Sequence, residues 1–138
     1  MITWLKAEEQ HQHKNGGGWI ANTATVEDSV YIGPDAWVCG NARVYGNARV
    51  LGNAWVSGDA RVYGNARVYG NAQVFGDARV FGDARVYGNA RVYGDARVYG
   101  NAQVLDDARM YGNAQVFGDA RVFGDAQVFG DAGNEKGF

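Results

Sequence analysis

The chain has 138 residues, a length that accommodates one domain, and it carries 21 glycines, one proline and a formal net charge of −2. This slightly acidic balance argues against a protein whose main task is to bind nucleic acid through bulk positive charge. A single cysteine, Cys39, excludes an internal disulfide framework. No apolar run is long enough to span a membrane, and the first residues lack the pattern of a secretory signal. We therefore expect a soluble, cytoplasmic protein that does not contact a membrane.

Residues 1–19 show no repeat and are expected to form a cap at one end of the domain. Thr3 could cap a short helix that ends near His13, and a short strand or an irregular segment is the alternative. A stack of repeats has to cover the unpaired strand edges at its ends. We expect Trp4 and Trp19 to lie over the terminal coil.

Residues 20–132 repeat a six-residue phrase, G-[N/D]-A-x-V-x, without an insertion or deletion, and residues 133–138 form a tail that loses it. In residues 42–47, ARVYGN, small and aliphatic residues alternate with polar and aromatic ones, which predicts a short strand followed by a Gly-Asn turn. One hexad is too short to bury its own apolar face. Successive coils should therefore stack about 4.8 Å apart, with ladders of valine and alanine inside.

The turn of each hexad is interpreted from Pro34, which occupies the slot that is glycine in nearly every other hexad. Because proline fixes φ at about −65°, this slot is expected to have negative φ. The asparagine or aspartate that follows would then have the positive φ of a type II turn. On this reasoning Asp106, which replaces the glycine in a later hexad, needs no special backbone conformation.

The phrase IGPDAWV at residues 32–38 and the G-[N/D]-A-R-V-Y repeats after it resemble the hexapeptide-repeat superfamily over residues 20–132. The nearest resemblance is to uncharacterised repeat proteins of enterobacteria and their prophages. It implies an all-β fold, a left-handed parallel β-helix of triangular section with three hexads per coil and about six coils. Proteins of this superfamily are commonly homotrimers, so it also implies a homo-oligomer, with a trimer favoured.

With three hexads per coil, residues 18 apart stack on one face, and one face carries an arginine ladder beside an unbroken aromatic ladder. Stacked like charges repel, and aspartates at the corners or cation–π contacts could offset this repulsion. The aromatic rings can pack on one another, but a long apolar stripe also marks an interface. We therefore predict that this face mediates self-association through Arg43, Arg61, Arg79, Arg97, Tyr45, Tyr63, Phe81, Tyr99 and Phe117.

Trp37 and Trp55 are neighbours on another face, beside smaller residues, and could wall a shallow groove suited to a sugar ring. Packing by the N-terminal segment, through Trp4 or Trp19, is the alternative.

Two clusters resemble metal ligands. His11 and His13 form an H-x-H pair, but two ligands in a glycine-flanked segment are more typical of solvent-exposed cap residues. A ladder of aspartates at one corner could hold Ca²⁺ through carboxylate oxygens. Asparagine occupies the same corner in other coils, which favours a preference of the turn over a cation site. We predict no metal and no cofactor. The aspartates of this corner are Asp59, Asp77 and Asp95, and the asparagines are Asn41 and Asn113.

Acyltransferases of the resembled superfamily use a histidine on or near a coil, and its carbonic anhydrases bind metal through three histidines. This chain has no histidine after His13 and no loop excursion from the repeat. We therefore predict no enzymatic activity. The favoured interpretation is a structural or protein-interaction module, a rigid self-associating rod that could be phage-derived and then a virion component. The alternatives are a degenerate acyltransferase with an inter-subunit site, and a binder of polysaccharide or another polyanion along an Arg/aromatic face.

Overall fold

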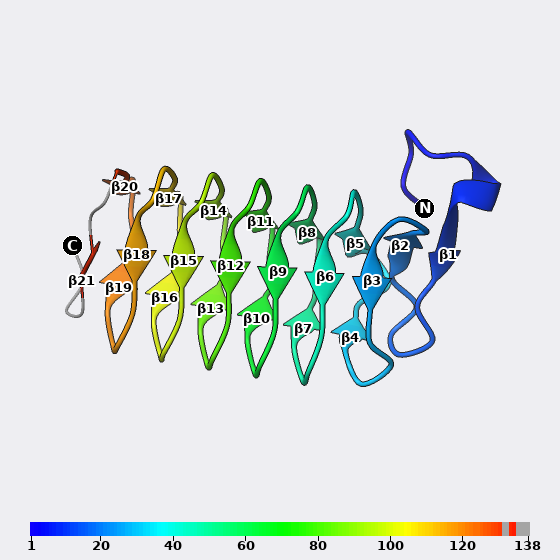
Figure 1. The fold of residues 1–138 in the computed structure, drawn as a ribbon, viewed down its shortest axis with the longest axis horizontal. Coiled ribbons are helices and arrows are strands. Elements are labelled where there is room, and N and C mark those ends of the chain that lie inside the picture. The colour runs from blue at the N-terminus through cyan, green and yellow to red at the C-terminus, as the bar shows by residue number, and fades with distance from the viewer. Residues whose placement is uncertain (131–132, 135–138) are drawn as a thin grey trace.

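Each hexad folds into a two-residue strand and a turn. In β6 (Arg43–Val44) the valine is buried and the arginine is exposed, and β7 (Arg49–Val50) repeats this pattern. The protein is described by a computed structural model that covers residues 1–130 and 133–134. Across these residues the strands stack as a row of similar coils (Figure 1).

Three consecutive strands make one coil, and strands 18 residues apart pair in parallel, so that Arg79 lies opposite Arg61 and Arg97. Sheet A contains β1 (Gln10–Gln12), β2 (Trp19–Ala21), β5 (Trp37–Val38), β8 (Trp55–Val56), β11 (Gln73–Val74), β14 (Arg91–Val92), β17 (Arg109–Met110) and β20 (Gln127–Val128). Sheet B contains β3 (Thr25–Val26), β6, β9 (Arg61–Val62), β12 (Arg79–Val80), β15 (Arg97–Val98), β18 (Gln115–Val116) and β21 (Gly133–Asn134). Sheet C contains β4 (Tyr31–Ile32), β7, β10 (Arg67–Val68), β13 (Arg85–Val86), β16 (Gln103–Val104) and β19 (Arg121–Val122).

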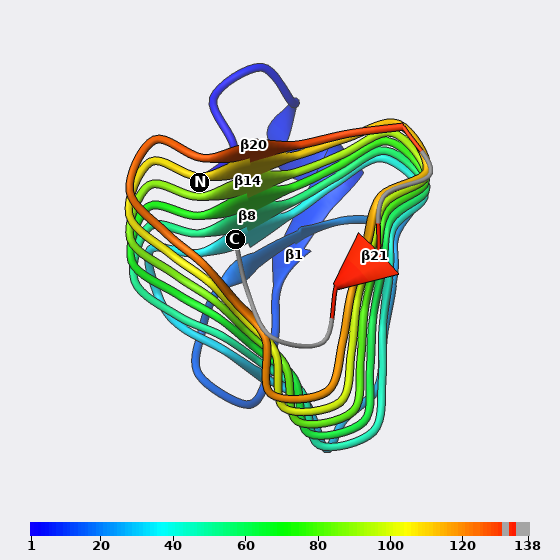
Figure 2. The same ribbon diagram turned by 90° about the vertical axis from the view of Figure 1, so that its left-hand side faces the viewer.

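The three sheets enclose a triangular prism (Figure 2). Seen from the C-terminal end, the chain runs clockwise from sheet A to sheet B to sheet C while it approaches the viewer, so the coils wind left-handed (Figures 1 and 2). The predicted left-handed parallel β-helix with three hexads per coil is confirmed.

The interior consists of stacked aliphatic side chains. Every alanine and aliphatic slot from Ala36 to Val122 is fully buried, and full burial of one valine side chain contributes about 1.5–3 kcal/mol. Met110 takes a valine slot between Val92 and Val128, because an unbranched thioether adapts to a cavity shaped by neighbours. These ladders form one continuous hydrophobic core along the prism.

The turn prediction made from Pro34 is wrong. The glycine of each later turn has positive φ, between 62° and 72° from Gly40 to Gly130, and Asp106 in the same slot has φ 59°. The residue after the glycine does not have positive φ, so the turn is of type II′ rather than type II. Pro34 lies in the first coil, where these slots hold non-glycine residues without positive φ, and it does not represent the others.

A second reason for glycine at this slot is the closeness of the coils. A Cβ atom at Gly76 would lie 2.9 Å from the backbone nitrogen of Gly94, one coil further on. Asp106 accommodates its side chain by accepting a hydrogen bond from the backbone N–H of Gly124, with Oδ2 and N 3.0 Å apart. Glycine is thus favoured in this slot both by its positive φ and by the close approach of the next coil.

Of the alternatives given for the N-terminal segment, the structure shows a short strand and not a helix from Thr3 to His13. The segment contains a 3₁₀ turn, η1 (Ala7–Glu9), and strand β1, which pairs antiparallel with β2. Gly18 donates a backbone hydrogen bond to the Ile32 carbonyl, and the Ile32 N–H donates to Asn15. A strand and a loop therefore supply backbone hydrogen-bond partners for the outer edges of sheets A and C. Within the described part of the chain, no helix is both long and apolar enough to cross a membrane.

Candidate interaction surface

Sheet B presents the predicted aromatic ladder as one column of parallel rings. The ring centroids of Tyr45 and Tyr63 lie 4.7 Å apart at an interplanar angle of 2°, and those of Tyr99 and Phe117 lie 5.3 Å apart at 12°. All five rings, including Phe81 in the middle, are half-buried. Because the rings stack along the axis of the solenoid, their faces cover one another and their edges point outward.

The acidity of one hydroxyl group in the ladder differs from its ordinary value. Burial raises the pKa of Tyr63, with a smaller effect in the same direction from Tyr45, whereas the nearby guanidinium of Arg79 opposes the increase. In sheet C, burial likewise raises the pKa of Tyr69. These tyrosines therefore remain neutral donors at neutral pH.

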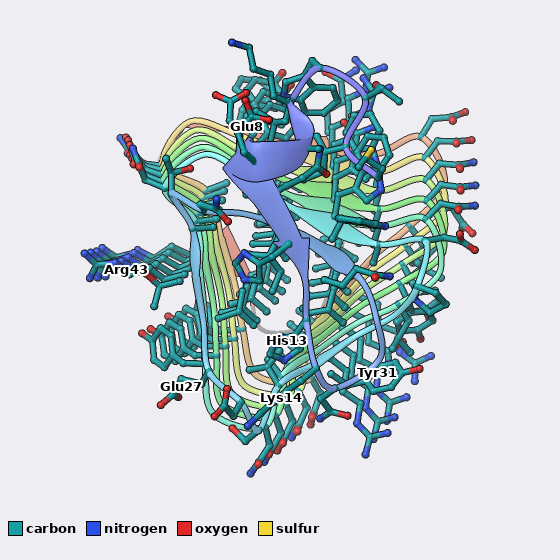
Figure 3. The ribbon with its side chains drawn as sticks, turned by 90° about the vertical axis from the view of Figure 1, so that its right-hand side faces the viewer. Glu8, His13, Lys14, Glu27, Tyr31 and Arg43 are labelled. Carbon is teal, nitrogen blue, oxygen red and sulfur yellow. The ribbon has the colours of Figure 1, made fainter. Side chains whose placement is uncertain are left out.

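The arginine ladder projects from the same sheet, and Figure 3 shows the Arg43 row pointing away from the prism. Arg61 and Arg79 are half-buried, while Arg43 and Arg97 are exposed. None of the four guanidinium groups has a carboxylate oxygen of residues 1–130 within 4.0 Å. The corner aspartates thus do not pair directly with this ladder.

An ion pair does form elsewhere, in the N-terminal part of the chain. Lys14 Nζ lies 2.8 Å from Asp28 Oδ2 on the surface. The hydrogen bond and the charge of Lys14 lower the pKa of Asp28.

A groove of about 520 Å³ runs along the solenoid between the arginine ladder and the corner that joins sheets A and B. The groove is lined by Asp59, Arg61, Asp77, Arg79, Asp95, Arg97, Asn113 and Gln115. Two stripes of opposite charge therefore lie side by side. No three histidine, cysteine or acidic side chains within the described residues come close enough to hold a metal ion, so the aspartates do not form the Ca²⁺ cluster considered above.

A second groove, of about 530 Å³, lies at the corner between sheets B and C, and its carboxylates have different surroundings. There Asn65 Nδ2 donates to Asp83 Oδ1 at 3.2 Å, and Asn101 Nδ2 donates to Asp119 Oδ1 at 3.3 Å. Asparagine thus supplies a hydrogen-bond donor to the aspartate in the next coil. The three consecutive aspartates of the first groove have no asparagine between them.

The N-terminal segment packs on Trp37 and Trp55, as in the alternative to a ligand groove given above. The Trp4 ring meets Trp37 edge-on at 5.4 Å and Trp55 at 5.7 Å, while Trp37 and Trp55 stack at 5.2 Å. Ile2 and Cys39 belong to a small buried cluster against which Trp37 packs, and burial raises the pKa of the Cys39 thiol. Trp4 therefore lies against the side of sheet A rather than over the terminal coil.

The two histidines of the H-x-H pair bind different partners. His11 Nδ1 lies 2.6 Å from Asn22 Oδ1, and His13 Nε2 lies 2.7 Å from the Val30 carbonyl oxygen. His13 is buried, so it ties the cap to the first coil instead of lying in solvent as expected.

Three glutamines in arginine slots have a role that sequence reasoning missed. The hydroxyls of Tyr87, Tyr99 and Tyr111 donate to the side-chain oxygens of the glutamines sixteen residues later, at 2.9, 3.1 and 3.1 Å. The recurring tyrosine-to-glutamine spacing is the signal that could have revealed these bonds. The acceptors are Gln103, Gln115 and Gln127.

Comparison with known protein families matches six segments of the chain to the YdcK β-solenoid repeat. The matched segments are residues 42–58, 60–74, 72–88, 84–100, 90–106 and 114–130. No curated protein and no solved structure matches the chain. The matched segments together cover more than half of the sequence and fall within the stacked coils. The chain therefore belongs to the YdcK β-solenoid repeat family.

Proposed function

We propose that this β-solenoid is a non-enzymatic structural module, a rigid rod that associates with further copies of itself through the outer face of sheet B. The observation that supports the proposal is the unbroken column of rings from Tyr45 to Phe117 beside the arginine ladder. Aromatic and arginine side chains are the types enriched at protein interfaces. Backbone pairing between all successive coils keeps this face flat and rigid.

The surroundings of the arginines favour a protein partner over a polyanion. A polyanion that lay along the ladder would also meet the carboxylates of Asp59, Asp77 and Asp95, which line the same groove. A second copy of the chain carries both signs of charge. The resemblance to the hexapeptide-repeat superfamily supports a trimer as the assembled form, and a phage-derived rod of this kind would serve as a virion component.

The proposal is tested by removing the rings of sheet B. The triple variant Tyr63→Ser, Phe81→Ser and Tyr99→Ser removes the three middle rings of the ladder without changing the net charge. Light scattering coupled to size-exclusion chromatography should give the mass of an oligomer for the native chain and of a monomer for the variant. Far-UV circular dichroism establishes that the variant retains its β-structure.

Sheet A provides a matched control, because it also carries a stack of consecutive rings, four from Phe75 to Phe129. The variant Phe75→Ser, Tyr93→Ser and Tyr111→Ser removes the same number of rings from a different face and should leave the oligomer intact. A monomeric native chain would contradict self-association. Dissociation of the control, with the sheet B variant still assembled, would move the interface to sheet A.

A further inference from the structure

We propose that the groove between the aspartate and arginine stripes is a contact between copies whose solenoid axes are parallel, with the arginine stripe of one copy against the aspartate stripe of the next. This inference rests on the proposed self-association and adds its orientation and its chemistry. The aspartate stripe is Asp59, Asp77 and Asp95, and the arginine stripe is Arg61, Arg79 and Arg97.

Each stripe repels itself within a single chain. Side chains of equal charge repeat at about one strand spacing, 4.8 Å, and like charges directly opposite on neighbouring strands are destabilising. The two stripes lie too far apart for ion pairs closer than 4.0 Å among the residues described. The charge is therefore available to a partner.

The aspartate stripe also differs from the other corners of the prism. At the corner between sheets B and C, Asn65 donates a hydrogen bond to Asp83, and at the corner between sheets C and A, Asn89 donates to Asp107 at 3.2 Å. Such donors stabilise the carboxylates from within the chain. The corner beside the arginine stripe has three carboxylates in succession and no donor between them.

The order of the stripes selects the occupant and its orientation. A second copy rotated about an axis parallel to the solenoid presents the two stripes in reversed order across the contact. Asp59 then faces Arg61 of the second copy, Asp77 faces Arg79, and the same holds in the third coil. An antiparallel copy presents the two stripes in the same order across the contact. Aspartate then faces aspartate and arginine faces arginine, or, if the copy is shifted sideways, one stripe has no partner. In a threefold assembly, the arginine stripe of each copy would meet the aspartate stripe of the next copy around the ring.

Other charged occupants fit less well. A polyanion would pair with the arginine stripe and be repelled by the aspartate stripe. A polycation would pair with the aspartate stripe and be repelled by the arginine stripe. A parallel copy satisfies both stripes in three successive coils, and each arginine–carboxylate pair can form two parallel hydrogen bonds.

The test exchanges the charges of each stripe separately. The acidic variant carries Arg61→Glu, Arg79→Glu and Arg97→Glu, so its groove contains acidic side chains only. We expect it to be monomeric by light scattering under conditions in which the native chain is assembled. Circular dichroism and thermal unfolding monitor the fold.

The basic variant carries Asp59→Lys, Asp77→Lys and Asp95→Lys, and we expect it to be monomeric alone as well. An equimolar mixture of the two variants should form a complex that contains both chains, because an acidic groove then meets a basic one. A chain that carries all six changes should assemble without a partner. Recovery on mixing cannot arise from a merely structural role of these residues.

Three results would contradict this inference, and two of them leave the proposed function standing. A native chain that is monomeric contradicts both. A native oligomer that is sensitive to loss of the sheet B rings, while the acidic and basic variants assemble separately as the native chain does, overturns only the charged contact. Variants that fold but stay monomeric when mixed also overturn it.

Orientation is measured with spin labels at the aspartate corner. Asn41→Cys and Asn113→Cys place labels four coils apart, about 19 Å at one strand spacing per coil. Cys39 is replaced by serine, the residue that occupies the equivalent slot at Ser57. Parallel copies should give a shorter distance between two Asn41 labels than between an Asn41 label and an Asn113 label on the other copy. The opposite order would overturn the parallel arrangement.

Discussion

Alanine at Gly112 should destabilise the solenoid more than alanine at Gly124, although the two glycines have the same φ of 63°. A Cβ atom at Gly112 would lie 2.8 Å from the backbone nitrogen of Gly130, whereas a Cβ at Gly124 meets no described atom within 4 Å. The two sites lie twelve residues apart near the same end of the stack. They therefore separate the effect of backbone conformation from the effect of the next coil.

The magnitudes follow from these two terms. A non-glycine residue in the left-handed region costs about 1–2 kcal/mol, and this cost applies at both sites. Forcing a methyl group against a packed neighbour costs about 1–3 kcal/mol more, and this term applies to Gly112 alone. Alanine also lowers the entropy of the unfolded chain, which offsets about 0.4–1 kcal/mol, but this offset cancels in the comparison.

Guanidinium unfolding followed by far-UV circular dichroism measures the difference directly. We expect Gly112→Ala to lose about 1–3 kcal/mol more than Gly124→Ala. Equal losses at the two sites would show that positive φ alone selects glycine, and that the separation of the coils relaxes to admit a methyl group.

Three further predictions concern other contacts. Asp106→Ala should be less stable than Asp106→Gly by about 1–2 kcal/mol, because both lose the carboxylate hydrogen bond to the next coil and only glycine relieves the positive φ; the reverse order in urea unfolding would contradict this. Tyr99→Phe should cost about 0.5–1.5 kcal/mol through loss of the bond to Gln115, and an unchanged unfolding midpoint would count against that bond. Ile2→Ala should speed modification of the buried Cys39 thiol by a disulfide reagent at a fixed alkaline pH, whereas an unchanged rate would show that Ile2 does not protect the sulfur.

The period of the sequence was sufficient to predict short strands, turns and stacked coils, because a strand of two faces repeated every six residues has few ways to bury its valines. The left-handed winding and the three hexads per coil were predicted from the resemblance to the hexapeptide-repeat superfamily. The sign of φ in the turn could not be obtained in the same way. Both glycine and asparagine tolerate positive φ, and Pro34 occurs in the first coil, where the turn differs. The deciding contact is the approach of Gly76 to the backbone of Gly94, which is a property of stacked coils.

The cap and the tryptophan cluster depended on contacts that are distant in sequence. Local preferences permitted a helix after Thr3, but the open edge of sheet A is satisfied by the strand β1. The sequence placed Trp37 beside Trp55 correctly, since they lie 18 residues apart and stack in adjacent coils. Whether Trp4 or a ligand covers them depends on how the N-terminal segment returns to the prism.

The distribution of aspartate among the turns indicates which surface carries a requirement from outside the chain. Where only the turn matters, asparagine and aspartate are interchangeable, and asparagine adds a hydrogen bond to the next coil, as between Asn71 and Asn89. Three consecutive aspartates forgo that bond and add repulsion. In the same three coils an arginine stands two residues after each aspartate, and no ion pair within the described chain compensates either charge. The repulsion and the missing hydrogen bonds, repeated in three coils at one corner, are explained if both stripes pair with opposite charges on another copy of the rod.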